Sequence, residues 1–198
     1  MHQIAPKLWV GSQADFEELD QFGTEWSSVH AARDPWHRKE LGYTGRGAPP
    51  DHPEYLFARR GNRLLLNLVD AADPKYIGIQ VIDEAMRFID EQLLTIRADP
   101  DHNPNALLIC CNKGGSRAPT VGMLYLAPTL SADFEEAEEE YRAEKCPSYA
   151  PGTGMREFAR ANWRRYHERA LSPVEDCTAD AALDKADRML RLKLEIHP

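Results

Sequence analysis

Short apolar runs alternate with amphipathic stretches along most of the chain. The apolar runs have the length and composition of buried strands, and they cover Leu8–Val10, Ser27–Ala31, Leu64–Val69 and Ala106–Cys110. Helical spacing of apolar residues predicts helices over Ser12–Gln21, Ile77–Ile96, from Ala118 onward, Phe134–Tyr141 and Met155–Tyr166. Strands that alternate with helices in this way indicate an α/β fold with a mainly parallel central sheet flanked by helices.

Two segments depart from this alternation. Residues 33–61 are rich in Pro, Gly and aromatic residues and are predicted to form a long insert, which is uncommon without a role. The insert either forms a lid or wall of a pocket or simply packs over the sheet. Residues 171–198 show an amphipathic pattern and are predicted to be a C-terminal helical extension, following a domain of residues 1–170.

Composition and charge narrow the class of protein. The chain has 198 residues and a net charge of −8, which argues against general nucleic-acid binding. It carries no long apolar run and no secretory pattern at its start, so we expect no membrane span and a cytoplasmic location. Its four cysteines lack paired metal spacing, so we expect no metal and no cofactor. Nothing in the sequence sets the oligomeric state.

The loop after the last predicted strand combines a thiol, two glycines and an arginine. Gly114 and Gly115 allow the loop amides to curl into a concave anion-binding turn, and the next helix adds its positive dipole end. Arg117 supplies a planar fork for phosphate oxygens, and the same field favours the thiolate of Cys111. The predicted phosphate-binding residues are Asn112, Lys113, Gly114, Gly115, Ser116 and Arg117. The hypothesis requires a sulfur that an anion can reach.

The segment Cys110–Arg117 resembles the signature His-Cys-x-x-Gly-x-Ser-Arg of the dual-specificity branch of the cysteine-dependent protein tyrosine phosphatase superfamily. Five residues separate the thiol of Cys111 from Arg117, as the family requires. Ile4–Ser12 is similar to the family's opening strand and turn, and Cys146–Pro151 to its closing segment. The resemblance implies a dual-specificity phosphatase-like fold, with residues 1–170 as a phosphatase-like catalytic domain.

Two positions depart from the family pattern. Cys110 stands where the family has a histidine that helps to orient the loop and tune the thiol. Ala118 stands where a hydroxyl residue commonly assists breakdown of the phosphocysteine intermediate, and Ser116 and Thr120 are nearby hydroxyls. Cys110 is expected to be a buried packing residue, with capture of an oxidised Cys111 as the minor alternative.

The resemblance also implies an aspartate that protonates the leaving group. Asp70 directly follows an apolar strand, where the family's acid usually lies, and Asp73 is the alternative. An aspartate before a proline commonly begins a helix, so Asp73 is also a candidate capping residue.

The function expected from these residues is phosphomonoester hydrolysis through a phosphocysteine intermediate. Cys111, Arg117 and Asp70 are the predicted catalytic residues. The expected partner is a phosphorylated protein, with phosphotyrosine and phosphoserine or phosphothreonine as substrates, or another phosphomonoester. Alternatives are a non-catalytic phosphate-binding pseudophosphatase, a phosphatase of phosphoinositides or RNA ends, and sulfur transfer.

Overall fold

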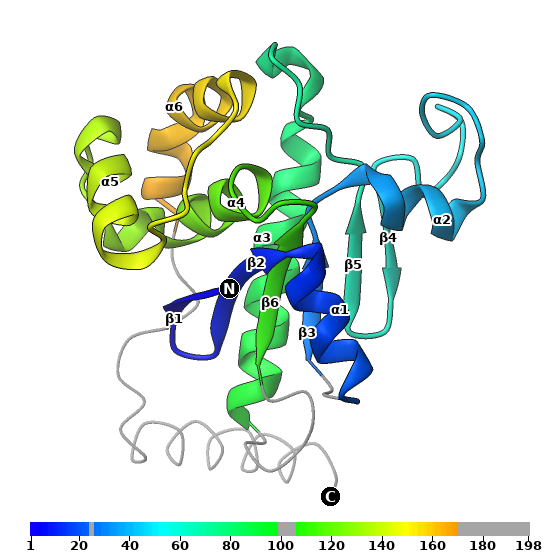
Figure 1. The fold of residues 1–198 in the computed structure, drawn as a ribbon. Coiled ribbons are helices and arrows are strands. Elements are labelled where there is room, and N and C mark those ends of the chain that lie inside the picture. Colours follow the sequence, from blue (N-terminus) through cyan, green and yellow to red (C-terminus); the bar gives the residue numbers. More distant parts are fainter. Residues whose placement is uncertain (24–25, 99–105, 170–198) are drawn as a thin grey trace, which may run out of the picture.

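The computed structural model describes residues 1–23, 26–98 and 106–169. Its centre is a six-stranded sheet in the order β1-β2-β6-β3-β5-β4 (Figure 1). The strands are β1 His2–Ala5, β2 Leu8–Ser12, β3 Ser27–His30, β4 Phe57–Arg60, β5 Arg63–Leu66 and β6 Leu107–Cys111. The helices are α1 Gln13–Gln21, α2 Arg38–Leu41, α3 Ile79–Ala98, α4 Arg117–Leu126, α5 Phe134–Glu140 and α6 Thr153–His167. Shorter helical turns cover Arg33–His37, Pro74–Tyr76, Ala127–Thr129 and Tyr141–Lys145.

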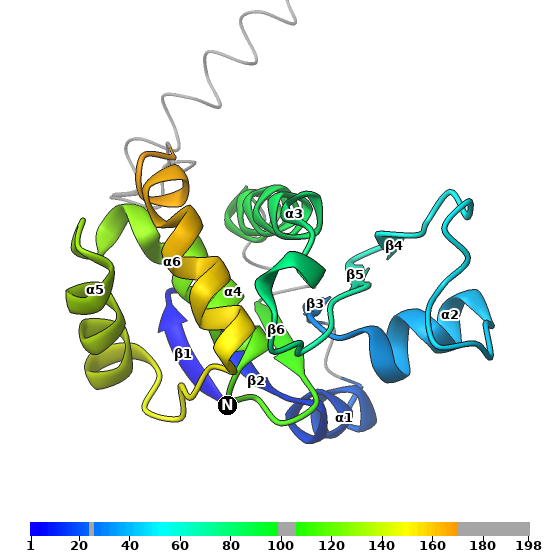
Figure 2. The ribbon, with the colours of Figure 1, turned by 90° about the horizontal axis from the view of Figure 1, so that it is seen from above.

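The predicted α/β fold with a mainly parallel sheet is confirmed. Strands β2, β6, β3 and β5 pair in parallel, whereas β1 and β4 join the two edges in antiparallel orientation. Figure 2 shows α3, α4, α5 and α6 on one face of the sheet and α1 on the other. Every residue of β6 is buried, because the strand has neighbours on both sides and helices on both faces.

The predicted insert is more structured than a simple loop. Residues 33–61 contain the turn Arg33–His37, the short helix α2 and the edge strand β4. The predicted C-terminal extension, residues 171–198, lies outside the described residues. Within the described ranges, no helix is both long and apolar enough to cross a membrane.

The fold brings the loop between β6 and α4 to the carboxyl edge of the parallel strands. Chain segments at this edge of an α/β sheet commonly form ligand sites. Strand β6 ends at Cys111 and α4 begins at Arg117, so the loop predicted to bind phosphate lies at this edge.

Candidate active site in the loop after β6

The loop after β6 turns through a position that only glycine fits well. Gly114 has a φ of +72°, and a Cβ there would lie 2.9 Å from the backbone carbon of Gly11 and from the nitrogen of Ser12. Gly115 accepts a hydrogen bond of 2.8 Å from the backbone nitrogen of Ala150. The loop is therefore held closely between β2 on one side and the segment before α6 on the other.

Cys111 lies at the end of β6 and belongs to the hydrophobic core. Only 2 % of its surface is exposed. The hypothesis concerns access to the sulfur alone, so the role of Cys111 stays a prediction, while the residue as a whole has this low exposure. The cause is local: Cys111 is still part of the central strand, and its side chain packs within the core cluster.

The guanidinium of Arg117 is largely buried and only partly satisfied. Its Nη2 donates to Asn112 Oδ1 at 2.5 Å, and its Nη1 donates to the carbonyl of Leu68 at 3.4 Å. Its Nε is buried and has no hydrogen-bond partner, although Asp70 Oδ2 lies 3.9 Å away. A buried donor without a partner destabilises a protein by about 1–3 kcal/mol. An oxyanion that accepted a hydrogen bond from this nitrogen would remove that cost, so the nitrogen favours anion binding.

Of the two candidate aspartates, Asp70 lies beside the loop. Its Oδ1 accepts a hydrogen bond of 3.0 Å from the hydroxyl of Ser116, and that hydroxyl accepts one of 3.0 Å from the backbone nitrogen of Gly152. A Cβ at Gly152 would lie 2.7 Å from Asp70 Oδ1. The absence of a side chain at Gly152 thus leaves the space in which the Asp70 carboxylate sits.

Asp73 has a local structural role instead. It is the capping residue of the turn Pro74–Tyr76, and its side chain accepts a hydrogen bond of 3.0 Å from the backbone nitrogen of Lys75. The Lys75 ammonium also lies 2.7 Å from Asp73 Oδ2. The Lys75 side chain is the largest cause that lowers the pKa of Asp73. This carboxylate is therefore already paired.

The hydroxyl of Thr120 is also engaged, since it donates to the carbonyl of Ser116 at 2.8 Å. No hydroxyl stands at position 118 itself. The side chain of Ser116 already bonds Asp70, so both nearby hydroxyls have partners in this structure.

A histidine that the sequence analysis did not single out contacts the cysteine before the loop. His30 Nδ1 lies 3.4 Å from Cys110 Sγ, and its Nε2 lies 3.0 Å from the hydroxyl of Ser28. Burial, with a smaller contribution from the charge of Arg63, lowers the pKa of His30 to about 3. Burial also raises the pKa of the Cys110 thiol. At neutral pH a neutral thiol therefore faces a neutral imidazole.

The two adjacent cysteines face opposite sides of the sheet. Successive residues of a strand alternate between faces, and Cys110 points toward His30 while Cys111 packs in the core. The position of His30 follows from the parallel register, in which His30 pairs with Cys110. This arrangement favours the packing role of Cys110 and disfavours capture of an oxidised Cys111.

The turn Arg33–His37 lies against the loop. Asn112 Nδ2 donates to the carbonyl of Asp34 at 2.9 Å. Trp36 is partly buried against the core, and His37 is fully buried, with its Nε2 2.9 Å from the carbonyl of Glu54. This part of the insert therefore packs as the second alternative expects, while its backbone reaches the loop directly.

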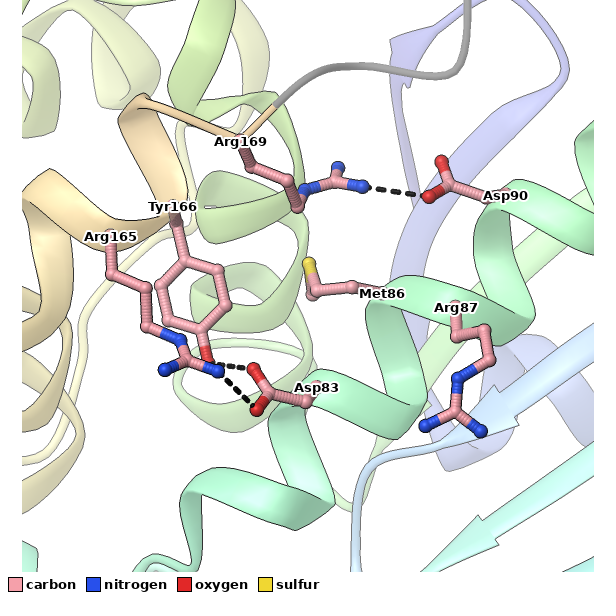
Figure 3. Close-up of a pocket in the computed structure, with 7 residues that line it drawn as sticks. All are labelled: Asp83, Met86, Arg87, Asp90, Arg165, Tyr166 and Arg169. Atoms are coloured by element: carbon pink, nitrogen blue, oxygen red, sulfur yellow. Dashed lines mark hydrogen bonds and ion pairs between the residues drawn. The ribbon is translucent and has the colours of Figure 1, made fainter.

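A cavity of about 450 Å³ lies between α3 and α6, away from the loop (Figure 3). Several of its polar residues are paired across it: Arg165 and the hydroxyl of Tyr166 bond to Asp83 at 2.6 and 3.0 Å, and Arg169 bonds to Asp90 at 2.7 Å. Such pairs join the two helices, and we assign no chemistry to this cavity. Within the described ranges no group of three or more His, Cys, Asp or Glu residues could hold a metal ion.

Comparison with known proteins identifies the fold. No protein-family model and no curated protein sequence matches the chain. The human tyrosine phosphatase-like serine/threonine/tyrosine-interacting protein is similar in structure, with a TM-score of 0.53 and 18% identity over 84% of this chain and 97% of that one. The Yvh1 phosphatase domain from Chaetomium thermophilum has a TM-score of 0.52 and 16% identity, over 88% of this chain and 99% of that one. The expected dual-specificity phosphatase-like fold is thereby confirmed: this chain shares the fold of these phosphatase and phosphatase-like structures.

Proposed function

We propose that the chain hydrolyses phosphomonoesters in two steps through a phosphocysteine. The thiolate of Cys111 attacks phosphorus in line, a sulfur–phosphorus bond forms, and the bond from phosphorus to the leaving oxygen breaks. Asp70 gives its proton to that oxygen, while Arg117 and the loop amides bind the equatorial oxygens. Water then attacks phosphorus, Asp70 takes a proton from it, and inorganic phosphate leaves as the thiolate is restored.

The observation that carries this proposal is the Nε of Arg117, which has no hydrogen-bond partner and lies 3.9 Å from Asp70 Oδ2. A site that only bound phosphate would gain nothing from a carboxylate 3.9 Å from its arginine, because two anions repel each other. A site that transfers phosphate needs both groups, one for the oxygens and one for the leaving group. Ser116 and Gly152 support the proposal, since they hold the carboxylate in place without consuming the arginine.

The substrate class follows from the superfamily rather than from particular contacts. We propose phosphoproteins, with phosphotyrosine and phosphoserine or phosphothreonine as the hydrolysed groups. Phosphoinositides and phosphorylated RNA ends are the other substrates considered. The net charge of −8 disfavours general affinity for nucleic acid.

A non-catalytic phosphate-binding protein is the second candidate, and three observations favour it. Cys111 is only 2 % exposed, and Ala118 removes a hydroxyl that would assist the second step. One of the similar structures described above is itself named phosphatase-like and interacting. In this case tungstate would bind to the loop, but phosphate esters would not be turned over.

Hydrolysis of an aryl phosphate by the wild type and by Cys111→Ser separates these functions. The proposal expects turnover that vanadate inhibits and that Cys111→Ser abolishes. Tungstate binding with no turnover in either protein would select the non-catalytic alternative. Activity that survives Cys111→Ser would exclude the phosphocysteine route, and thiosulfate as a competing donor tests sulfur transfer.

A further inference from the structure

Both protein acceptors that hold the Arg117 guanidinium are themselves bonded to the insert. The carbonyl of Leu68 accepts from Arg117 Nη1 at 3.4 Å and also from the backbone nitrogen of Arg33 at 2.9 Å. The side chain of Asn112 accepts from Arg117 Nη2 at 2.5 Å and donates to the carbonyl of Asp34 at 2.9 Å. The orientation of the arginine therefore depends on the backbone of Arg33–Asp34 through two separate routes.

We infer that Asn112 is a positioning residue, whose side-chain amide transmits the position of the Arg33–Asp34 backbone to Arg117. The inference rests on the proposed function and extends it, since the loop signature leaves the residue after the cysteine open. An amide suits this place because one end accepts and the other donates. Arg117 offers only donors and the carbonyl of Asp34 only an acceptor, so the amide can lie in one orientation only. The 3.4 Å contact of Nδ2 with Gln13 Oε1 agrees with that orientation.

The amide also governs which donors stay available to an oxyanion. With Nη2 held by Asn112 and Nη1 by Leu68, the Nε edge of Arg117 is the part of the fork without a hydrogen-bond partner. Removal of the Asn112 amide leaves the 3.4 Å bond to Leu68 as the arginine's remaining hydrogen bond among those described. The guanidinium would then adopt more orientations, and its alignment in the transition state would become less favourable.

The test is a double-mutant cycle on aryl phosphate hydrolysis with Asn112→Ala and Arg117→Lys. Asn112→Ala is expected to lower kcat about tenfold, the worth of one hydrogen bond to a charged group, with a smaller change in KM. In the Arg117→Lys background the same substitution is expected to change kcat less than twofold, because the residue through which it acts is already altered. Gln13→Ala is the matched control: it removes the 3.4 Å contact to Asn112 and is expected to leave kcat unchanged.

Two results would overturn the inference: wild-type kcat in Asn112→Ala, or an equal tenfold loss in both backgrounds. Unfolding temperatures of the four proteins of the cycle show whether a loss of kcat merely follows a loss of fold. The proposed function fails separately, if Cys111→Ser retains activity or if the wild type has none. Tungstate affinity then replaces kcat in the same cycle: weaker binding in Asn112→Ala supports the inference, and equal binding refutes it.

Discussion

Acid should destabilise this protein through His30, the buried imidazole behind the loop. In the folded chain its pKa is about 3, against an ordinary value of 6.5, because burial disfavours the charged form. As pH falls below 6.5 the unfolded chain binds a proton at this residue, whereas the folded chain does not until pH approaches 3. The stabilisation that the neutral imidazole provides is therefore present above pH 6.5 and is lost as pH falls.

The size of the effect follows from linkage. Each pH unit between the two pKa values lowers the free energy of unfolding by about 1.4 kcal/mol per histidine. Between pH 6.5 and about pH 4.5, His30 alone should therefore lower it by roughly 2 kcal/mol, a large share of the stability of a single domain. His37 is also buried with a lowered pKa and acts in the same direction.

The assay is urea unfolding of the wild type and His30→Gln at these two pH values. Between these two pH values, the free energy of unfolding of His30→Gln is expected to fall by about 2 kcal/mol less than that of the wild type, because glutamine does not titrate. His37→Gln is the comparison variant: it removes the contribution of His37 only, so its loss between the two pH values should still include the part that His30 provides. Equal losses in the wild type and His30→Gln would refute the account of a buried neutral imidazole.

Two other substitutions test the site and its support. Asp70→Asn is expected to lower kcat for an aryl phosphate by a factor of about 10²–10⁴, while tungstate still binds. Asp73→Asn is expected to leave kcat near the wild-type value. The reverse result would assign the role of the acid to Asp73. Gly154→Ala would place a Cβ 2.1 Å from the carbonyl oxygen of Ala71, so it is expected to lower the free energy of unfolding by about 1–3 kcal/mol in urea titration. An unchanged midpoint would show that Gly154, at the start of α6, does not lie against the backbone of Ala71.

The central sheet could be predicted because its strands are buried on both faces. Such strands appear in the sequence as nearly continuous apolar runs, as in Leu107–Cys111. The edge strands β1 and β4 are not predicted, for the opposite reason. Phe57–Arg60 is half exposed and ends in two arginines, so its short run lacks the signal of a buried strand, and it was assigned to the insert.

The loop could be predicted because its residues are contiguous, whereas its partners come from elsewhere in the chain. The choice between Asp70 and Asp73 depends on which carboxylate the turn brings to Ser116, and no local pattern records this. The contact of His30 with Cys110 depends on the register between β3 and β6. The low exposure of Cys111 depends on the packing around the end of β6.

The most direct test of the central claim is mass spectrometry of protein quenched in acid during turnover of an aryl phosphate. The account predicts the mass of one phosphoryl group on the peptide that contains Cys111, and its absence from Cys111→Ser. The account would be contradicted if Cys111→Ser hydrolysed the ester as fast as the wild type and no such adduct formed during turnover.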